Sequence, residues 1–392
     1  MILNDENLWR AIYGLYCLLM DRVNDEDAYQ AFFERHPIVF SVLGLDDARS
    51  FEKRSTYSLP FDDDRHFRPE PDFVGVDRAA GRIVIVELKT PFVDEITTSR
   101  SDGNRAKFKA SAESYISQAT EYAESIRQRV EARDVIKHVL NIERISDYRI
   151  VLVYGTGSDN DARLVSELAA QRKIPTEIVF YDTLFENMVD KYAFHRRDIL
   201  SRPGWCFVFH LVLDSKQTHR RSFLGEYGAD AEDRVSVFLE DSSLVFECLD
   251  EEKRTHRLQS SINGPGPHYV RFEFSNDADG IYMSLNVNNT EQDLRVGRRT
   301  LSLTPDTSIF TLGADSNGHH GASFVMLEHY AVGRTMGLLE KLESFYYFER
   351  KTQRPLHGLE FKPESFMVRL PSGHLVQGQE DLKPVLREWS PA

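Results

Sequence analysis

The spacing of hydrophobic residues changes near residue 200, and this change restricts the chain to folds with two different halves. Before residue 200, segments with the helical spacing of apolar groups alternate with short apolar segments typical of strands. After the turn-forming residues 201–204, helical spacing nearly disappears and short segments that alternate apolar with polar residues take over. The sequence therefore predicts a domain boundary close to residue 200.

The first part, residues 1–200, shows the pattern of an α/β domain. Helices are expected at 7–20, 26–35, 105–133, 160–171 and 183–199, and strands at 71–77, 82–88, 149–154 and 176–181. Strands that alternate with helices after an opening hairpin indicate a sheet with helices packed on it.

The second part, residues 204–350, predicts an all-β domain. Along 280–288, the apolar residues Ile281, Met283 and Leu285 point to one side and alternate with polar residues that point to the other. Many such strands with turn residues between them favour an antiparallel β-sandwich of the jelly-roll kind. Residues 351–392 form a C-terminal extension, with one hairpin expected from 367–370 and 374–376.

Composition limits the classes of protein to which the chain can belong. The 62 acidic and 48 basic residues leave a formal net charge of −14, so contact with a polyanion requires a local basic patch and bound cations. Three widely spaced cysteines fit neither a disulfide framework nor a zinc site. The longest early apolar run, 15–20, is too short to span a bilayer. We therefore expect a cytoplasmic protein that does not contact membranes.

The stretch 71–91, PDFVGVDRAAGRIVIVELKTP, has charged groups at both ends of a hydrophobic hairpin. A turn centred between Ala79 and Ala80 places Asp72 directly opposite Glu87 on one face of the sheet. In that register the two Cβ atoms lie about 4.5–5.5 Å apart, close enough for both carboxylates to reach one cation. Because like charges opposite each other destabilise a strand pair, we expect a divalent cation to compensate.

Lys89 follows Glu87 by two residues, so its ammonium group is expected on the same face. Mg²⁺ suits two carboxylates because it keeps several waters and also binds substrate phosphate oxygens. Lys89 would then orient the attacking water or stabilise the charge of the transition state. The alternative is an ordinary cluster of Asp, Glu and Lys on an exposed strand face.

The residues Pro71-Asp72, a gap of fourteen residues and Glu87-Leu88-Lys89 match the PD-(D/E)XK nuclease signature. Together with ERHP at 34–37, PDFV and VELKTP, they make residues 25–200 resemble the nuclease domain of the Shedu anti-phage defence proteins. The resemblance implies a restriction-endonuclease-like fold, phage defence and homo-oligomers. It also implies an acidic residue from the first helix beside the metal, and Glu34 is the candidate.

A second match lies on the expected long helix, where Gln118 and Tyr122 fit the Q-x-x-x-Y element of RecB-like nucleases. The two residues are four apart and therefore share one helical face, where they would support the site. The alternative is that Gln118 is ordinary helix surface and Tyr122 is core.

Five residues are candidates for contact with the nucleic-acid backbone: Arg100, Arg105, Lys107, Lys109 and His36. The first four bring four positive charges against Asp102 alone, just after the E-x-K strand, and so form a local phosphate grip. A solvated surface is the alternative for this basic run. His36 could touch phosphate, although His-Pro is also a common pair at the end of a helix.

The β-sandwich resembles laminin G-like and concanavalin A-like domains, most clearly at 310–315 and 324–330. No strand carries the E-x-D-x-x-E spacing of the glucanases with this fold, so we interpret the domain as a binding module for an unknown ligand. The sequence thus predicts a Mg²⁺-dependent endodeoxyribonuclease, with Mn²⁺ able to substitute, that cleaves DNA, in particular phage DNA. The alternative is a non-catalytic DNA-binding scaffold whose jelly roll binds a phage protein, peptide or glycan.

Overall fold

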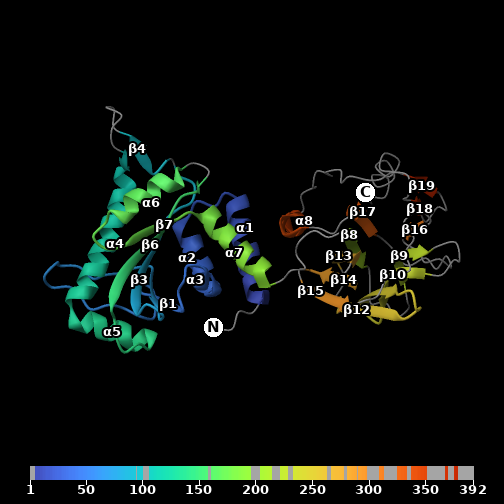
Figure 1. Ribbon diagram of the computed structural model, residues 1–392, viewed down its shortest axis with the longest axis horizontal. Helices are drawn as coiled ribbons and strands as arrows, with labels where there is room; N and C mark the ends of the chain where they lie inside the picture. Colours follow the sequence, from blue (N-terminus) through green and yellow to red (C-terminus); the bar gives the residue numbers. More distant parts are fainter. Residues whose placement is uncertain are drawn as a thin grey trace. The chain divides into compact units, whose positions relative to one another are not determined.

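The chain divides into two units, Met1–Arg197 and Asp198–Ala392, in the computed structural model (Figure 1). The structure describes residues 5–93, 95–99, 106–157, 160–195, 204–213, 221–227, 233–262, 266–277, 280–288, 290–297, 309–312, 325–332, 337–350, 367–369 and 375–377. Each unit has its own sheets and its own core.

A five-stranded mixed sheet organises the first unit. Its strands are β1 (Asp47–Ser50), β2 (Phe73–Asp77), β3 (Arg82–Leu88), β6 (Asp147–Val153) and β7 (Thr176–Val179), in the order β1-β2-β3-β6-β7. The pairs β1·β2 and β2·β3 are antiparallel, whereas β3·β6 and β6·β7 are parallel. The central strand β3 is buried on both faces, because six of its seven residues are buried. Such burial requires helices on both sides of the sheet.

Helices cover both faces of this sheet (Figure 1). One face carries α4 (Ala110–Gln128), α5 (Val130–Leu140) and α6 (Ala162–Ala170), and the other carries α1 (Asp5–Met20), α2 (Glu26–Arg35), α3 (Ile38–Val42) and α7 (Tyr181–His195). Val74 and Ile85 pack with Ala119 of α4 in the core on the first face. On the second face, the rings of Phe33 and Phe40 pack on Phe73.

The register predicted for the opening hairpin is confirmed. Phe73 pairs with Val86, and Asp77 pairs with Arg82, so residues opposite each other follow the expected spacing. Extended by one residue, this register brings Asp72 opposite Glu87. The alternation of side chains then directs both residues to the sheet face covered by α4.

The prediction of a single helix over 105–133 is wrong at both ends. Residues Ala106–Phe108 form strand β5, which pairs with β4 (Thr97–Ser99) in a small antiparallel hairpin. The helix is also interrupted at Arg129, whose backbone is extended with φ −106° and ψ 125°. The Arg129 guanidinium donates a hydrogen bond to the Pro60 carbonyl, which ties the break to a distant loop. The apolar spacing continues through the break because α4 and α5 bury the same face in the same core.

The second unit consists of two sheets and one helix. Its elements are β8 (Gly204–Leu213), β9 (Arg221–Tyr227), β10 (Asp233–Glu240), β11 (Ser243–Leu249), β12 (Thr255–Ser261), β13 (Gly266–Asp277), β14 (Gly280–Val287), β15 (Thr290–Val296), β16 (Ile309–Leu312), β17 (Val325–Val332), α8 (Leu338–Arg350), β18 (Met367–Arg369) and β19 (Leu375–Gln377). The strand orders are β12-β11-β10-β9-β16-β18-β19 and β15-β14-β13-β8-β17.

Aromatic rings join the two sheets face to face. Phe246 of β11 contacts Phe272 and Phe274 of β13, with ring centroids 5.2 and 6.2 Å apart. The hairpin predicted near residue 370 is confirmed, since β18 pairs antiparallel with β19. β18 also pairs with β16, so these strands of the C-terminal extension belong to the seven-stranded sheet.

The five-stranded sheet of the second unit carries a buried cluster of charges on the face that does not meet the seven-stranded sheet. This cluster lies under α8. Lys341 Nζ lies 2.7 Å from Glu273 and 3.6 Å from Glu291. Arg271 Nη2 lies 3.0 Å from Glu291, and its Nε lies 3.7 Å from Glu273. Two cations thus face two carboxylates, and Arg271, Glu273 and Lys341 are buried. Burial lowers the pKa of Lys341, but the two carboxylates outweigh burial and raise the pKa above its usual value.

We expect Lys341→Ala to lower the free energy of unfolding by about 3–5 kcal/mol, because it leaves the buried Glu273 carboxylate without its nearest cation. Leu339→Ala, on the exposed side of the same helix, is the matched control and should change stability by less than about 1 kcal/mol. Urea unfolding followed by fluorescence measures both. Equal midpoints for the two variants would contradict a structural role for the cluster.

Candidate active site

Asp72, Glu87 and Lys89 come together at the carboxyl end of β3. Glu87 is the second-to-last residue of that strand, and the Lys89 backbone N–H continues the pairing by donating to the Val153 carbonyl of β6 at 2.9 Å. Asp72 immediately precedes β2. The site therefore lies at the edge of the sheet where open α/β folds bind their ligands, beyond the carboxyl ends of parallel strands.

Backbone hydrogen bonds hold the two carboxylates beside each other. The Leu88 N–H donates to Asp72 Oδ2 at 2.6 Å, and the Asp72 N–H donates to Glu87 Oε1 at 3.4 Å. Glu87 is 2% exposed. Asp72 and Glu87 therefore occupy the geometry that the register implies, on one face and at the end of a rigid strand.

The charges of this pair oppose each other. Burial raises the pKa of Asp72 to about 6, and the carboxylates of Glu26 and Glu52 add to this effect against the opposing influence of Lys89 and the Leu88 N–H. Burial, followed by the charge of Asp72, raises the pKa of Glu87 well above its usual value. Two carboxylates in this position cost stability when both are ionised, and a bound cation would remove that cost.

Lys89 is held in place by Glu26 and by an aromatic ring. Its Nζ lies 2.7 Å from Glu26 Oε1, 3.8 Å from Glu87 Oε2 and 5.2 Å from the centroid of the Tyr115 ring. The Lys89 side chain is only 9% exposed. Burial lowers its pKa, but the nearby carboxylates outweigh burial and raise it, so Lys89 stays an ammonium at neutral pH.

The acid that α2 contributes beside Lys89 is Glu26, not Glu34. Glu26 is the first residue of the helix, and Glu34 comes eight residues later. Glu34 instead accepts a hydrogen bond from Gln30 and lines a cavity whose wall includes Phe73. The acid of α2 that lies next to the Asp72–Glu87–Lys89 group is therefore Glu26, whereas the expected Glu34 lies at the other end of the helix. The sequence offers only one signal for Glu26, namely that it is an acidic residue at the start of the helix.

Gln118 and Tyr122 lie one turn apart on α4, as their spacing predicts. The Gln118 amide donates to the Tyr122 hydroxyl at 2.7 Å. Tyr122 is buried in the core between the sheet and α4, and Gln118 is exposed. Burial raises the pKa of Tyr122, and the charges of Glu87 and Asp72 raise it further, so Tyr122 is within electrostatic reach of the carboxylates.

Tyr115 is a further member of the site that the apolar spacing assigns to the core. Its ring faces Lys89 and also meets the Tyr154 ring edge to face, with centroids 5.4 Å apart. Only the packing of α4 across the end of β3 reveals this contact. The ring both shields and attracts the ammonium group.

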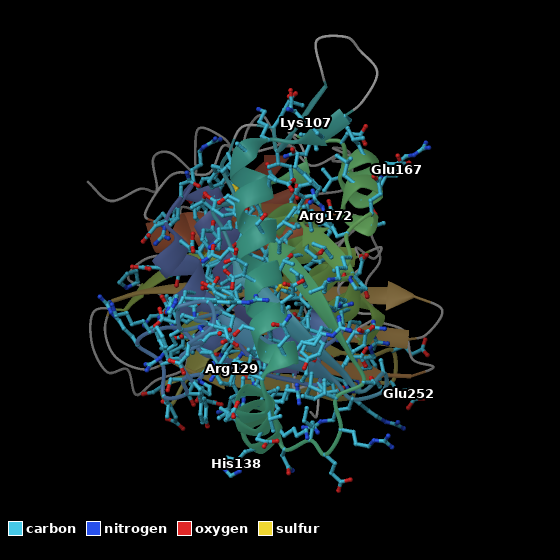
Figure 2. All side chains as sticks on the ribbon, turned by 90° about the vertical axis from the view of Figure 1, so that its left-hand side faces the viewer. Lys107, Arg129, His138, Glu167, Arg172 and Glu252 are labelled. Atoms are coloured by element: carbon cyan, nitrogen blue, oxygen red, sulfur yellow. The ribbon has the colours of Figure 1, made fainter. Side chains whose placement is uncertain are left out.

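The five residues predicted to contact phosphate lie in different parts of the first unit or outside the described residues. Arg100 and Arg105 lie outside the described residues. Lys107 is exposed on β5 near one end of α4, whereas Arg129 lies at the opposite end (Figure 2). Lys109 directly precedes α4.

His36 packs against the Phe32 ring at 5.1 Å. Burial lowers its pKa, helped by Arg35 and Arg10, which favours the neutral imidazole, and its contact with phosphate stays a prediction.

The described residues contain no group of three or more His, Cys, Asp or Glu side chains that could hold a metal ion. Any cation at this site would therefore depend on Asp72 and Glu87. Two carboxylates are sufficient for Mg²⁺, which retains waters and shares substrate phosphates, but they are too few for a closed zinc or calcium site. No helix in the described part of the chain is long and apolar enough to cross a membrane.

Residues 23–185 match the family described as Shedu protein SduA, C-terminal. The matched range includes α2, the whole five-stranded sheet and every residue of the site described above. The chain is therefore similar to this family over less than half of its length, within its first unit. No curated protein sequence matches this chain.

Several solved structures share limited similarity with the chain. One is the HCR/D W1238A mutant, with 10% identity, a TM-score of 0.23 and 29% of each chain covered. Another is the binding domain of botulinum neurotoxin DC in complex with SialylT, with 13% identity, a TM-score of 0.21 and 24% of each chain covered. This chain therefore spans less than a third of either structure.

A third structure is the Ruminococcus gnavus IT-sialidase CBM40 bound to alpha2,3 sialyllactose. It is 13% identical with a TM-score of 0.27, and the similarity covers 36% of this chain and 82% of that one. TM-scores this low define neither the fold nor the ligand of this chain.

We expect the contribution of Asp72 to the stability of the metal-free protein to fall as pH rises from about 4 to about 6. Asp72 has its pKa raised from 3.8 to about 6, so the folded protein holds a proton that the unfolded chain releases over this range. Well above pH 6 the contribution of Asp72 no longer changes. Asp72→Asn removes this penalty and should stabilise the protein in EDTA at pH 7.5 by about 1–3 kcal/mol.

Urea unfolding at pH 4.5 and pH 7.5 measures this difference. Asp64→Asn, at an exposed position, is the matched control and should follow the wild type at both pH values. If Asp72→Asn destabilises the metal-free protein at pH 7.5, the carboxylates are not in conflict and the electrostatic account of the site is wrong.

Proposed function

We propose that the first unit is a Mg²⁺-dependent endodeoxyribonuclease with a PD-(D/E)XK site, acting in anti-phage defence. The observation that carries the proposal is the convergence of the buried carboxylate of Glu87, the half-buried carboxylate of Asp72 and a charged lysine at the carboxyl end of β3. The match to the Shedu family supports the role in defence. DNA, in particular phage DNA, and further copies of the chain are the proposed partners.

Asp72 and Glu87 would hold the cation, and Mn²⁺ could replace Mg²⁺ because it also prefers oxygen ligands. When bound, the cation lowers the pKa of a water and neutralises charge on the phosphate. The backbone N–H of Leu88 donates a hydrogen bond to Asp72 Oδ2, so Oδ1 would be the oxygen that binds the cation. Glu87, at the end of a strand buried on both faces, holds its position rigidly.

Lys89 would orient the attacking water and stabilise the negative charge that develops on the phosphate oxygens. Glu26 positions Lys89 through the 2.7 Å ion pair, and the Tyr115 ring shields the same ammonium from solvent. Tyr122, which accepts a hydrogen bond from Gln118, would bound the site on the side of α4. These residues keep the lysine charged and close to the carboxylates without adding a third metal ligand.

The second candidate function is a non-catalytic DNA-binding scaffold. The observation that favours it is the small number of metal ligands, because the described residues offer no group of three. In either case we propose that the β-sandwich of the second unit is a binding module for a phage protein, peptide or glycan.

Lys89→Ala and Asp72→Asn should each lower the single-turnover rate of DNA cleavage in Mg²⁺ by at least about 100-fold, because the first removes the charge that acts on the reacting phosphate and the second weakens the hold on the cation. Lys137→Ala, at a partly exposed lysine of α5 outside the site, is the matched control and should cleave like the wild type. Cleavage that survives both site substitutions would contradict the assignment of the site. A wild type that cleaves no DNA in Mg²⁺ or Mn²⁺ would favour the scaffold.

Glu26→Gln should lower kcat by about 10-fold with little change in KM, because a weakened hold on Lys89 affects the chemical step more than DNA binding. Asp27→Asn, the exposed neighbour on α2, is the control and should leave both constants unchanged. Steady-state cleavage of a labelled duplex measures the two constants. A rise in KM alone would mean that Glu26 shapes the DNA surface and does not position Lys89.

A further inference from the structure

A cavity of about 350 Å³ opens beside the proposed active site, on the other side of β2. α2 and α3 form one wall, β1 forms a second, and residues 54–57 form a third. Figure 1 shows these elements of the first unit next to one another, and Ser50 of β1 pairs directly with Phe73 of β2. The volume lies within the range of roughly 300–1,000 Å³ that is typical of sites for small ligands.

The cavity is close to the site along the chain and in space. Phe73, which lines the cavity, immediately follows Asp72, and consecutive residues of a strand are about 3.3 Å apart along its axis. Glu52, which shortly precedes the wall residues 54–57, contributes to the charge that raises the pKa of Asp72. Because successive side chains of a strand point to opposite faces, the cavity lies on the sheet face opposite the carboxylates, so a DNA strand that passes around the start of β2 would bring a nearby nucleotide to it.

The bottom of the cavity is apolar and rigid. The rings of Phe33, Phe40 and Phe73 contact one another with centroids 4.9–6.1 Å apart. All three are buried. Tyr57 differs because it lies on the wall and is 36% exposed, so its ring is accessible to a ligand. An exposed ring beside an apolar surface is the usual platform on which a nucleic-acid base stacks.

Polar groups of both signs surround this apolar surface. Arg54 is exposed, and among the described residues it has no carboxylate within 4.0 Å. Glu34 accepts a hydrogen bond from Gln30 Nε2 through one oxygen, at 3.1 Å. The same Nε2 lies 3.4 Å from Ser50 Oγ. Gln30 is 9% exposed and its Oε1 has no hydrogen-bond partner, so a buried acceptor lies directly behind two residues of the cavity wall.

From this arrangement we infer that the cavity is a subsite for one unpaired nucleotide of the DNA strand held at the active site. Tyr57 stacks on the base, Arg54 binds a phosphate of the same strand, and Glu34 accepts a hydrogen bond from an exocyclic amino group, as acidic residues do with cytosine N4. A base can enter the cavity only when it is not paired in a duplex. The subsite therefore selects strands with an unpaired base that carries an amino group, cytosine over thymine.

This inference rests on the proposed function for the identity of the strand, but it can be tested without cleavage. The full chain in EDTA is titrated into fluorescein-labelled twelve-nucleotide oligo(dC) and oligo(dT), and binding is followed by anisotropy. We expect oligo(dC) to bind about 5- to 10-fold more tightly than oligo(dT). Tyr57→Ala should weaken both by about 10-fold, and Tyr57→Phe should restore binding because the ring is retained.

Glu34→Gln should abolish the preference for oligo(dC) while leaving binding of oligo(dT) unchanged. Arg54→Ala should weaken both oligonucleotides and reduce the salt dependence of binding by about one ion. Arg163→Ala, an exposed arginine on α6, is the matched control and should bind like the wild type. Unfolding midpoints of all variants show whether a loss of binding reflects a loss of folding.

Two results would overturn the subsite. The first is wild-type affinity in Tyr57→Ala and Arg54→Ala, and the second is equal binding of the two oligonucleotides by the wild type. Competition by free dCMP as effective as that by oligo(dC) would replace the strand subsite by a mononucleotide site. If the wild type cleaves no DNA but the variants behave as expected, the subsite stands and the nuclease proposal fails.

Discussion

The antiparallel pairing of β2 with β3 is the constraint on which the proposed site depends. Ile83 and Ile85 are buried toward α4, and Val84 and Val86 are buried toward the opposite face, so the hairpin has no freedom to slide. A slip by one residue would turn every buried side chain to the wrong face. The same slip would separate Asp72 from Glu87. Hydrophobic packing thus holds two carboxylates together although their charges repel each other.

Charge balance distinguishes two ionic clusters among the described residues. Under α8, the two carboxylates of Glu273 and Glu291 face the two cations of Arg271 and Lys341, so the charges of these four residues balance. At the end of β3, three carboxylates face the single ammonium of Lys89. A neutral cluster can stabilise the fold by itself. In a cluster with excess negative charge, a bound cation would relieve the repulsion between the carboxylates. The same physical rule therefore leads to different roles for the two clusters.

Two of the three carboxylates of α2 acquire roles once the helix is placed. Its first turn brings Glu26 to Lys89, and its last turn brings Glu34 to the cavity beside β1. The helix thereby connects the reacting centre with the proposed subsite for a neighbouring nucleotide. An overall acidic chain gains little from long-range attraction to DNA, so it depends on such local contacts and on cations.

The sequence alone determined the features that arise from local periodicity. The register of the opening hairpin follows from its turn and from the period of two residues, and the shared helical face of Gln118 and Tyr122 follows from their spacing of four. Glu26 and Tyr115 could not be found in this way, because their contacts with Lys89 join segments far apart in the chain. The break of the long helix at Arg129 likewise depends on a distant loop, since the apolar spacing runs on through it. Tertiary packing alone decides which acid reaches the lysine, because a helix offers several acidic positions and only its placement against the sheet selects one.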